Sequence, residues 1–136
     1  MNGYLLDTNH LSDAIRPVSR VRERIEQARR SGWRVGTCVP ALCELEVALH
    51  RVGHRGPSRR TLGHLLTRVR IWPIDPEVAG HYGIIFHELR SRGRVLSQVD
   101  LILAALTRVM DLTLLTADQD FEALPDLRRE NWLSEA

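Results

Sequence analysis

The stretch from Tyr4 to Asn9, with the sequence YLLDTN, limits most tightly what this chain can fold into. Three aromatic or aliphatic residues lead directly into a carboxylate, and a hydroxyl and an amide follow it. This pattern predicts a short buried strand that ends at the rim of a sheet. In open α/β sheets, ligands bind outside the carboxyl ends of the strands. Asp7 is therefore a candidate to hold a metal ion or a reacting group.

Strands and helices are predicted to alternate along the rest of the chain. The expected strands are Gly3–Asp7, Trp33–Val39, Ile71–Asp75, Leu112–Thr116 and Arg129–Leu133. The expected helices are Thr8–Arg16, Ser19–Arg30, Pro40–Val52, Thr61–Arg70, Pro76–Arg92 and Ser97–Val109. A loop is expected at Gly53–Ser58, a brief turn of strand at Val95–Leu96, and a loop or single turn at Ala117–Phe121. Such alternation predicts an α/β fold in which helices cover both faces of a parallel sheet.

Length and composition indicate one globular domain over residues 1–136. A hydrophobic content of 43% is enough for a core, and a charged content of 26% is ordinary for a globular protein. The longest fully apolar run, Leu101–Leu106, is far too short to cross a membrane. The first residues lack the pattern of a signal peptide. We therefore expect a cytoplasmic protein with no membrane partner.

The net charge is +2, but the basic and acidic residues are unevenly distributed along the chain. Residues 16–70 contain 13 Arg and four acidic residues, whereas the remainder contains six Arg and 13 acidic residues. The chain contains no Lys, so all of these basic residues are Arg, which favours bidentate contacts with phosphate or carboxylate. This pattern has two interpretations: a preference for Arg codons, or a basic surface beside an acidic site.

An acidic residue ends or interrupts an apolar segment at four places. They are Asp7, Glu44, Asp100, and the pair Asp118 and Asp120. Taken singly, each has a structural explanation: Asp7 or Asp100 as a helix cap, Glu44 as a solvated helix residue, and the last pair as turn residues. Taken together, they point to one rim. Asp7 and Asp118 follow strands, and Glu44 and Asp100 lie near the starts of helices that follow extended segments.

Several carboxylates at one rim repel each other, and a bound Mg²⁺ or Mn²⁺ removes that cost. These hard cations prefer carboxylate oxygens and keep several water ligands. Sites of this kind commonly serve phosphoryl chemistry, in which the metal supports both the attacking and the leaving oxygen. The acids therefore predict a metal-dependent phosphohydrolase.

The ordered set of motifs resembles the PIN-domain family, and most closely the VapC-type toxins of bacterial toxin–antitoxin pairs. The matching segments are Asp7-Thr8-Asn9, Glu44-Leu45, Asp100 with Ala104-Ala105, and Thr116-x-Asp118-x-Asp120-Phe121. The resemblance implies a three-layer α/β/α fold whose central, mainly parallel sheet has four to five strands. It also implies a Mg²⁺-dependent endoribonuclease, with Mn²⁺ able to substitute, that leaves 3′-hydroxyl and 5′-phosphate ends.

The same resemblance implies a role for each site residue. Asp7, Asp100 and Asp118 would hold the metal, and Glu44 would hold it or orient a water. Thr116 and Thr8 would be supporting hydroxyls, and Asp120 a variable extra ligand. The resemblance further implies homodimers and a VapB-type antitoxin whose C-terminal segment lies in the acidic groove.

Two other functions remain open from the residues alone. The first is a non-catalytic RNA- or protein-binding PIN-like module, which the complete set of acids disfavours. The second is a Mg²⁺ phosphohydrolase of a small molecule, which the Arg-rich segment disfavours. We expect RNA phosphates to be contacted by the arginines around the Gly53–Ser58 loop, namely Arg51, Arg55, Arg59 and Arg60.

Overall fold

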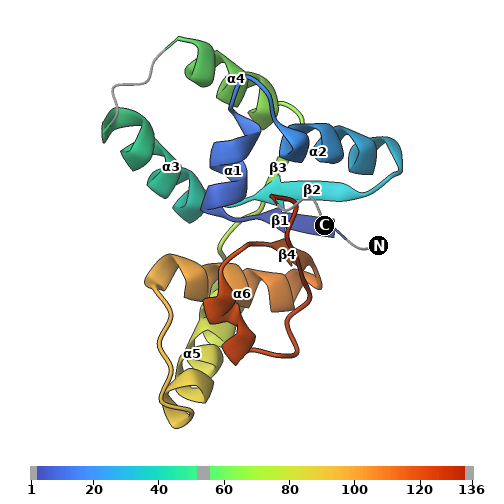
Figure 1. The fold of residues 1–136 in the computed structure, drawn as a ribbon. Coiled ribbons are helices and arrows are strands. Elements are labelled where there is room, and N and C mark those ends of the chain that lie inside the picture. The colour runs from blue at the N-terminus through green and yellow to red at the C-terminus, as the bar shows by residue number, and fades with distance from the viewer. Residues whose placement is uncertain (1–2, 52–55, 134–136) are drawn as a thin grey trace.

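In the computed structural model, which describes residues 3–51 and 56–133, five strands form one sheet in the order β3-β2-β1-β4-β5 (Figure 1). Every neighbouring pair is parallel. The strands are β1 (Gly3–Leu6), β2 (Arg34–Thr37), β3 (Arg70–Ile71), β4 (Thr113–Leu115) and β5 (Arg129–Glu130). The prediction of a parallel α/β sheet is confirmed.

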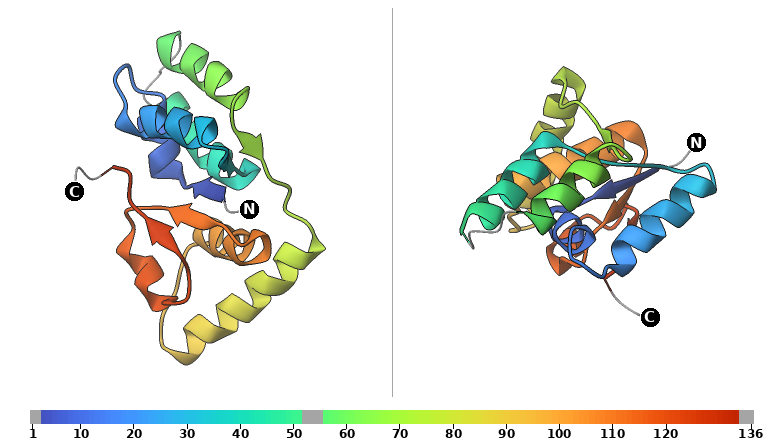
Figure 2. Two further views of the ribbon diagram at one scale, coloured as in Figure 1. Left: turned by 90° about the vertical axis from the view of Figure 1, so that its right-hand side faces the viewer. Right: turned by 90° about the horizontal axis from the view of Figure 1, so that it is seen from above.

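The helices form two layers, one on each face of the sheet (Figures 1 and 2). One layer holds α1 (Thr8–Ala14), α2 (Arg20–Arg30), α3 (Val39–Arg51) and α4 (Pro57–Leu66). The other holds α5 (Pro76–Ser91) and α6 (Gln98–Met110), and the short 3₁₀ helix η1 (Gln119–Ala123) follows β4. Within the described ranges, none of the helices has the length and apolar character that a membrane span requires.

The central strand β1 is short and apolar because it is buried on both faces of the sheet. Leu5 and Leu6 have no exposed surface, and they pair in register with Leu114 and Leu115 of β4, which are equally buried. The ladder continues one step beyond β1, where the Asp7 N–H donates to the Leu115 carbonyl at 3.2 Å. Asp7 is thus held at the end of the most buried part of the core.

The strand order creates a crevice beside β1. The chain runs from β1 outward to β2 and β3, and then returns to place β4 on the other side of β1. The carboxyl ends of β1 and β4 therefore flank a topological switch point, which is where open α/β sheets bind their ligands. The two helical layers also meet near this rim, because α3 contacts α6.

Several predicted boundaries differ in the structure; for example, α4 ends at Leu66 rather than Arg70, and β5 ends at Glu130 rather than Leu133. Helix α4 begins at Pro57 rather than Thr61, since proline is well suited to the first position of a helix. Pro57 and Ser58 are thus helical rather than part of the expected loop, and residues 52–55 of that loop lie outside the described range. Strand β3 has only two residues, because Pro73 has no N–H for a longer ladder. Val95–Leu96 forms no strand.

Candidate active site

Asp7 stands at the junction of β1 and α1 and belongs to both. Its backbone is extended, and its side chain caps α1 by accepting a hydrogen bond from the His10 N–H at 2.8 Å. It is only 5% exposed. The capping interpretation is therefore correct for Asp7, and it leaves the carboxylate facing the crevice beside β4.

Glu44 lies on α3, three residues after Ala41 and directly before Leu45, two buried residues that hold this helix against the core. Its side chain is exposed, and it accepts a hydrogen bond from the Thr8 hydroxyl at 2.6 Å. Thr8 directly follows Asp7 in the sequence. The hydrogen bond therefore ties Glu44 to the segment that carries Asp7.

Asp100 occupies the first turn of α6, and Ser97 rather than Asp100 caps that helix. The Ser97 hydroxyl accepts a hydrogen bond from the Asp100 N–H at 3.2 Å. An acid in the first turn is favoured by the helix dipole, but the cap does not require the Asp100 carboxylate. That side chain is half-buried, so it is available for another purpose.

Asp118 follows β4 and is held by its own turn. Its N–H donates to the Thr116 hydroxyl at 3.0 Å, and its carboxylate accepts from the Asp120 N–H at 2.8 Å. Thr116 is buried, whereas the Asp120 side chain is exposed. Asp118 lines the cavity described next, and Asp120 is not among the residues that do so.

One cavity of about 530 Å³ unites the four acids that the sequence selected. Its walls include Asp7, Glu44, Asp100 and Asp118, and Arg51 also lines it. These side chains come from the β1–α1 junction, α3, α6 and the segment after β4, which are far apart in the sequence. A larger cavity of about 630 Å³ lies between α2 and α4, but the described residues that line it include more Arg than Glu, so it is not an acidic site.

The acids in this cavity influence one another. Burial raises the pKa of Asp100 to about 6, a hydrogen bond from Ser97 opposes this rise, and the carboxylates of Asp118, Glu44 and Asp7 add to it. The ionised form of Asp100 is therefore less stable than that of an ordinary carboxyl group, and positive charge in the cavity would stabilise it. A raised carboxyl pKa in a cleft is a common mark of a functional site.

The cavity suits a hard divalent cation in charge and ligand type. Within residues 3–51 and 56–133, no group of three or more His, Cys, Asp or Glu side chains is arranged to hold a metal ion. Asp7 and Asp118 accept hydrogen bonds from N–H groups of their own turns, and Glu44 accepts one from the Thr8 hydroxyl. Mg²⁺ does not need three protein ligands, because it is usually held by one or two carboxylates and keeps several waters. The four carboxylates thus agree with the ligand preference of Mg²⁺ or Mn²⁺.

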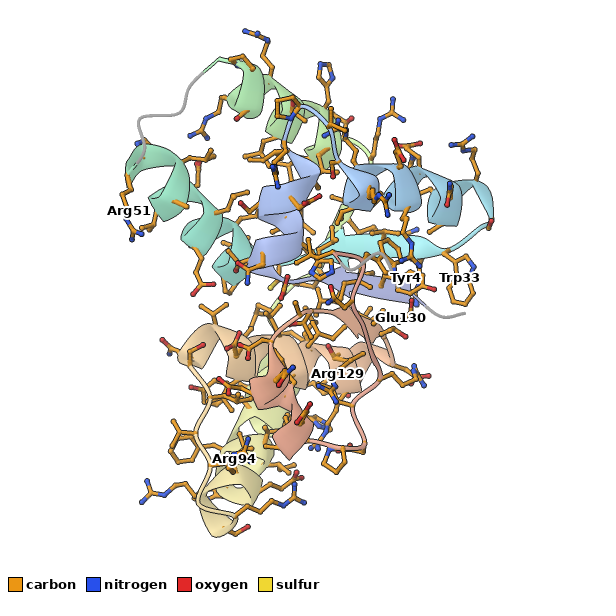
Figure 3. The ribbon with its side chains drawn as sticks, in the orientation of Figure 1. Tyr4, Trp33, Arg51, Arg94, Arg129 and Glu130 are labelled. Atoms are coloured by element: carbon orange, nitrogen blue, oxygen red, sulfur yellow. The ribbon has the colours of Figure 1, made fainter. Side chains whose placement is uncertain are left out.

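Two features of the site were not foreseen. His10 is fully buried and contacts Asp7 through its ring, a role that no sequence pattern indicated. Of the arginines expected to contact phosphate, Arg51 lies at the end of α3 and lines the cavity (Figure 3). Arg59 instead forms an ion pair with Glu46, and Arg55 lies outside the described residues.

The chain matches the family model described as PIN domain over residues 4–127. It is 29% identical over 134 residues to Ribonuclease VapC2 of Haemophilus influenzae, which covers 96% of this chain and 98% of that protein. It is 26% identical over 132 residues to Ribonuclease VapC2 of Rickettsia felis, covering 95% of this chain and 97% of that protein.

Solved structures show the same fold. VapBC2 from Rickettsia felis bound to a DNA fragment from their promoter superposes with a TM-score of 0.85 at 24% identity, covering 97% of this chain and 99% of that one. FitAcB from Neisseria gonorrhoeae superposes with a TM-score of 0.75 at 26% identity, covering 96% of this chain and 98% of that one. The likeness extends over nearly all of each chain, so the predicted three-layer fold is confirmed.

Proposed function

The chain belongs to the PIN-domain family, and from this membership we propose that it is the ribonuclease toxin of a toxin–antitoxin pair. It hydrolyses RNA phosphodiester bonds with the help of Mg²⁺ or Mn²⁺. The observation that carries the proposal is the single cavity at the β1/β4 switch point, lined by four carboxylates. The names of the relatives, Ribonuclease VapC2 in two organisms, support the same activity.

Each side chain in the cavity has a proposed task. Asp7, Asp100 and Asp118 hold the cation as carboxylates, since ligands must be deprotonated. Glu44, oriented by the Thr8 hydroxyl, holds the cation or orients a water for in-line attack on phosphorus. When bound, the cation neutralises the acids and the scissile phosphate and supports the attacking and leaving oxygens.

Among the described residues that line the acidic cavity, Arg51 is the basic one. A guanidinium presents paired N–H donors that match phosphate oxygens. Arg51 therefore contacts a phosphate of the bound RNA, while the acids act at the scissile bond. The products are a 3′-hydroxyl and a 5′-phosphate.

The partner in this proposal is a VapB-type antitoxin. VapBC2 from Rickettsia felis, which this chain resembles, carries the VapBC name, and a similar structure from Mycobacterium tuberculosis is described as a member of the VapBC family of toxin-antitoxin systems. An antitoxin segment with a basic side chain could place its charge beside Asp7, Asp100 and Asp118 and so exclude the metal. A disordered tail that orders on binding suits this task, because it can cover a wide surface.

The chain is also proposed to form homodimers. An apolar cavity of about 430 Å³ lies between α5 and the start of α6, and it is lined by Phe86 and Val95. These two side chains are 37% and 82% exposed. Exposed apolar surface of this kind commonly marks a protein interface. Val95→Asp should therefore shift the protein toward monomer in light scattering, whereas an unchanged mass would place the dimer interface elsewhere.

The test of the enzymatic proposal is RNA cleavage by the purified protein with Mg²⁺ and with excess EDTA. Cleavage should stop in EDTA and return with Mg²⁺ or Mn²⁺. Asp118→Asn should lower the rate more than about 100-fold, because loss of even an outer-shell partner costs 10- to 100-fold. Asp120→Asn, which changes an exposed acid two residues away, is the matched control and should keep most activity. Full cleavage in EDTA would refute the proposal, and RNA binding without cleavage would favour the non-catalytic alternative.

A further inference from the structure

His10 is a polar residue beside the acidic cavity, and it has no exposed surface. Its Nδ1 lies 2.9 Å from Asp7 Oδ1, and its Nε2 lies 3.0 Å from the backbone nitrogen of Trp132. Buried polar groups in native proteins almost always have hydrogen-bond partners, and here both ring nitrogens have one. The ring therefore bridges the start of α1 and the C-terminal segment, which are 122 residues apart.

The two partners determine which nitrogen carries the proton. The Trp132 backbone N–H is a donor, so Nε2 must accept and has no proton. Asp7 Oδ1 is an acceptor, so Nδ1 carries the proton and donates it. A neutral imidazole has one donor and one acceptor nitrogen, and this arrangement uses both. His10 cannot turn its ring over without losing both hydrogen bonds.

The effect on Asp7 is specific to one oxygen. The backbone N–H of His10 and its ring Nδ1–H both donate to Oδ1, at 2.8 and 2.9 Å. Among the contacts between described residues, no hydrogen bond ends on Oδ2. The carboxylate is thus anchored by one oxygen, and the other remains available at the cavity wall.

We propose that His10 is a positioning residue that orients the Asp7 carboxylate for cation binding. This inference rests on the proposed function, because it assumes that the cavity holds a divalent cation. Ligating carboxylates are commonly hydrogen-bonded by outer-shell partners, and the loss of such a partner typically costs 10- to 100-fold in metal affinity or activity. His10 supplies that partner to Asp7 and adds a link to a distant segment.

The far end of the link is itself held firmly. The Trp132 ring is 3% exposed and packs against Tyr4 of β1, with ring centroids 4.8 Å apart. Arg24 of α2 lies over the same ring at 4.6 Å, and the Trp132 Nε1–H donates to Glu130 at 3.0 Å. Tyr4 and Glu130 project from β1 and β5 on the same side of the molecule (Figure 3). The Trp132 backbone therefore presents its N–H to His10 from a fixed position.

Two substitutions separate positioning from packing. His10→Phe keeps the volume of the ring but removes both side-chain hydrogen bonds. His10→Asn restores a short amide that can donate to Asp7. In both variants the backbone N–H of residue 10 still donates to Asp7, which caps α1. Thr107→Val is the matched control, since it removes a buried hydroxyl that donates to the Leu103 carbonyl on α6.

The measurement is the Mn²⁺ dissociation constant of the full-length variants by calorimetry, together with their unfolding temperatures in EDTA. His10→Phe should weaken Mn²⁺ binding 10- to 100-fold. His10→Asn should recover most of that loss, and Thr107→Val should leave the affinity unchanged even if it lowers the unfolding temperature. Equal Mn²⁺ affinities for wild type and His10→Phe would overturn the inference alone. A wild-type protein that binds no Mn²⁺ would overturn the proposed function and this inference with it.

A second measurement does not depend on the stability of any variant. Nitrogen-15 NMR of wild-type protein should show His10 with a protonated Nδ1 and a bare Nε2, and these ring signals should move when Mg²⁺ saturates the protein. The inference would be overturned if His10 were protonated at Nε2, or if its ring signals stayed unchanged while Mg²⁺ binds to the protein.

Discussion

Asp100→Asn should stabilise the metal-free protein, although it removes a residue proposed to be essential for cleavage. Burial raises the pKa of Asp100 to about 6, and the neighbouring acids contribute to the rise. A group whose pKa is higher in the folded protein than in the unfolded chain stabilises the fold when the pH is below its unfolded-state pKa. This stabilisation is lost as the pH rises through the folded-state pKa. In the wild-type protein, the stabilisation from protonated Asp100 is therefore lost between about pH 4 and pH 6.

The magnitude follows from the size of the shift. A change of about two pKa units corresponds to about 3 kcal/mol as an upper limit. Asp100 is only half-buried, so solvent screening reduces this figure. Loss of an acid from the first turn of α6 also removes about 0.5 kcal/mol of favourable interaction with the helix dipole. We expect a net gain of about 1 to 2 kcal/mol above pH 7, which raises the unfolding temperature by about 3 to 8 °C for a chain of this size.

The assay is thermal unfolding of wild type and Asp100→Asn in EDTA at pH 7.5 and pH 4, and then at pH 7.5 with saturating Mg²⁺. The variant should be the more stable protein in EDTA at pH 7.5, and its advantage should shrink at pH 4. With Mg²⁺ the order should reverse, because only the intact site gains binding free energy. Glu77→Gln, which changes an acid in the first turn of α5, controls for the helix dipole. A lower unfolding temperature for Asp100→Asn in EDTA at pH 7.5 would refute this reasoning and make Asp100 a structural residue.

Three further predictions concern the cavity and its partners. Arg51→Gln should weaken RNA binding and lower the slope of log affinity against log salt concentration by about 0.7, as expected for the loss of one phosphate contact. Arg59 is paired with Glu46, so Arg59→Gln should change this slope less. Glu44→Gln should lower the cleavage rate constant in single-turnover assays about 100-fold. Thr8→Val removes the hydrogen bond to Glu44 and should lower the same rate constant about 10-fold. An antitoxin tail peptide should bind more weakly when Mg²⁺ is saturating; equal affinities, with cleavage still blocked, would place the inhibition outside the metal site.

The parts of the fold that depend on local pattern were predictable. The apolar run before Asp7 predicts β1, and parallel strands bring their carboxyl ends to one rim, so Asp7 and Asp118 could be placed together without a structure. The start of α4 was missed, although Pro57 offered a local signal for a first helical turn.

The parts that depend on tertiary contacts were not predictable from one sequence. His10 meets Trp132 across 122 residues, and nothing in the spacing of either residue indicates the contact. Likewise, Arg59 is neutralised by Glu46 across the segment that joins α3 and α4. Charge counts along the chain could not separate it from Arg51, which lies at the cavity.

The most direct test of the central claim is the position of a bound metal ion. Crystals soaked in Mn²⁺ should give an anomalous diffraction peak inside the cavity lined by Asp7, Asp100 and Asp118, and Asp100→Asn crystals treated in the same way should lose most of it. Wild-type crystals with no peak in this cavity, from protein that still cleaves RNA in Mn²⁺, would contradict the account.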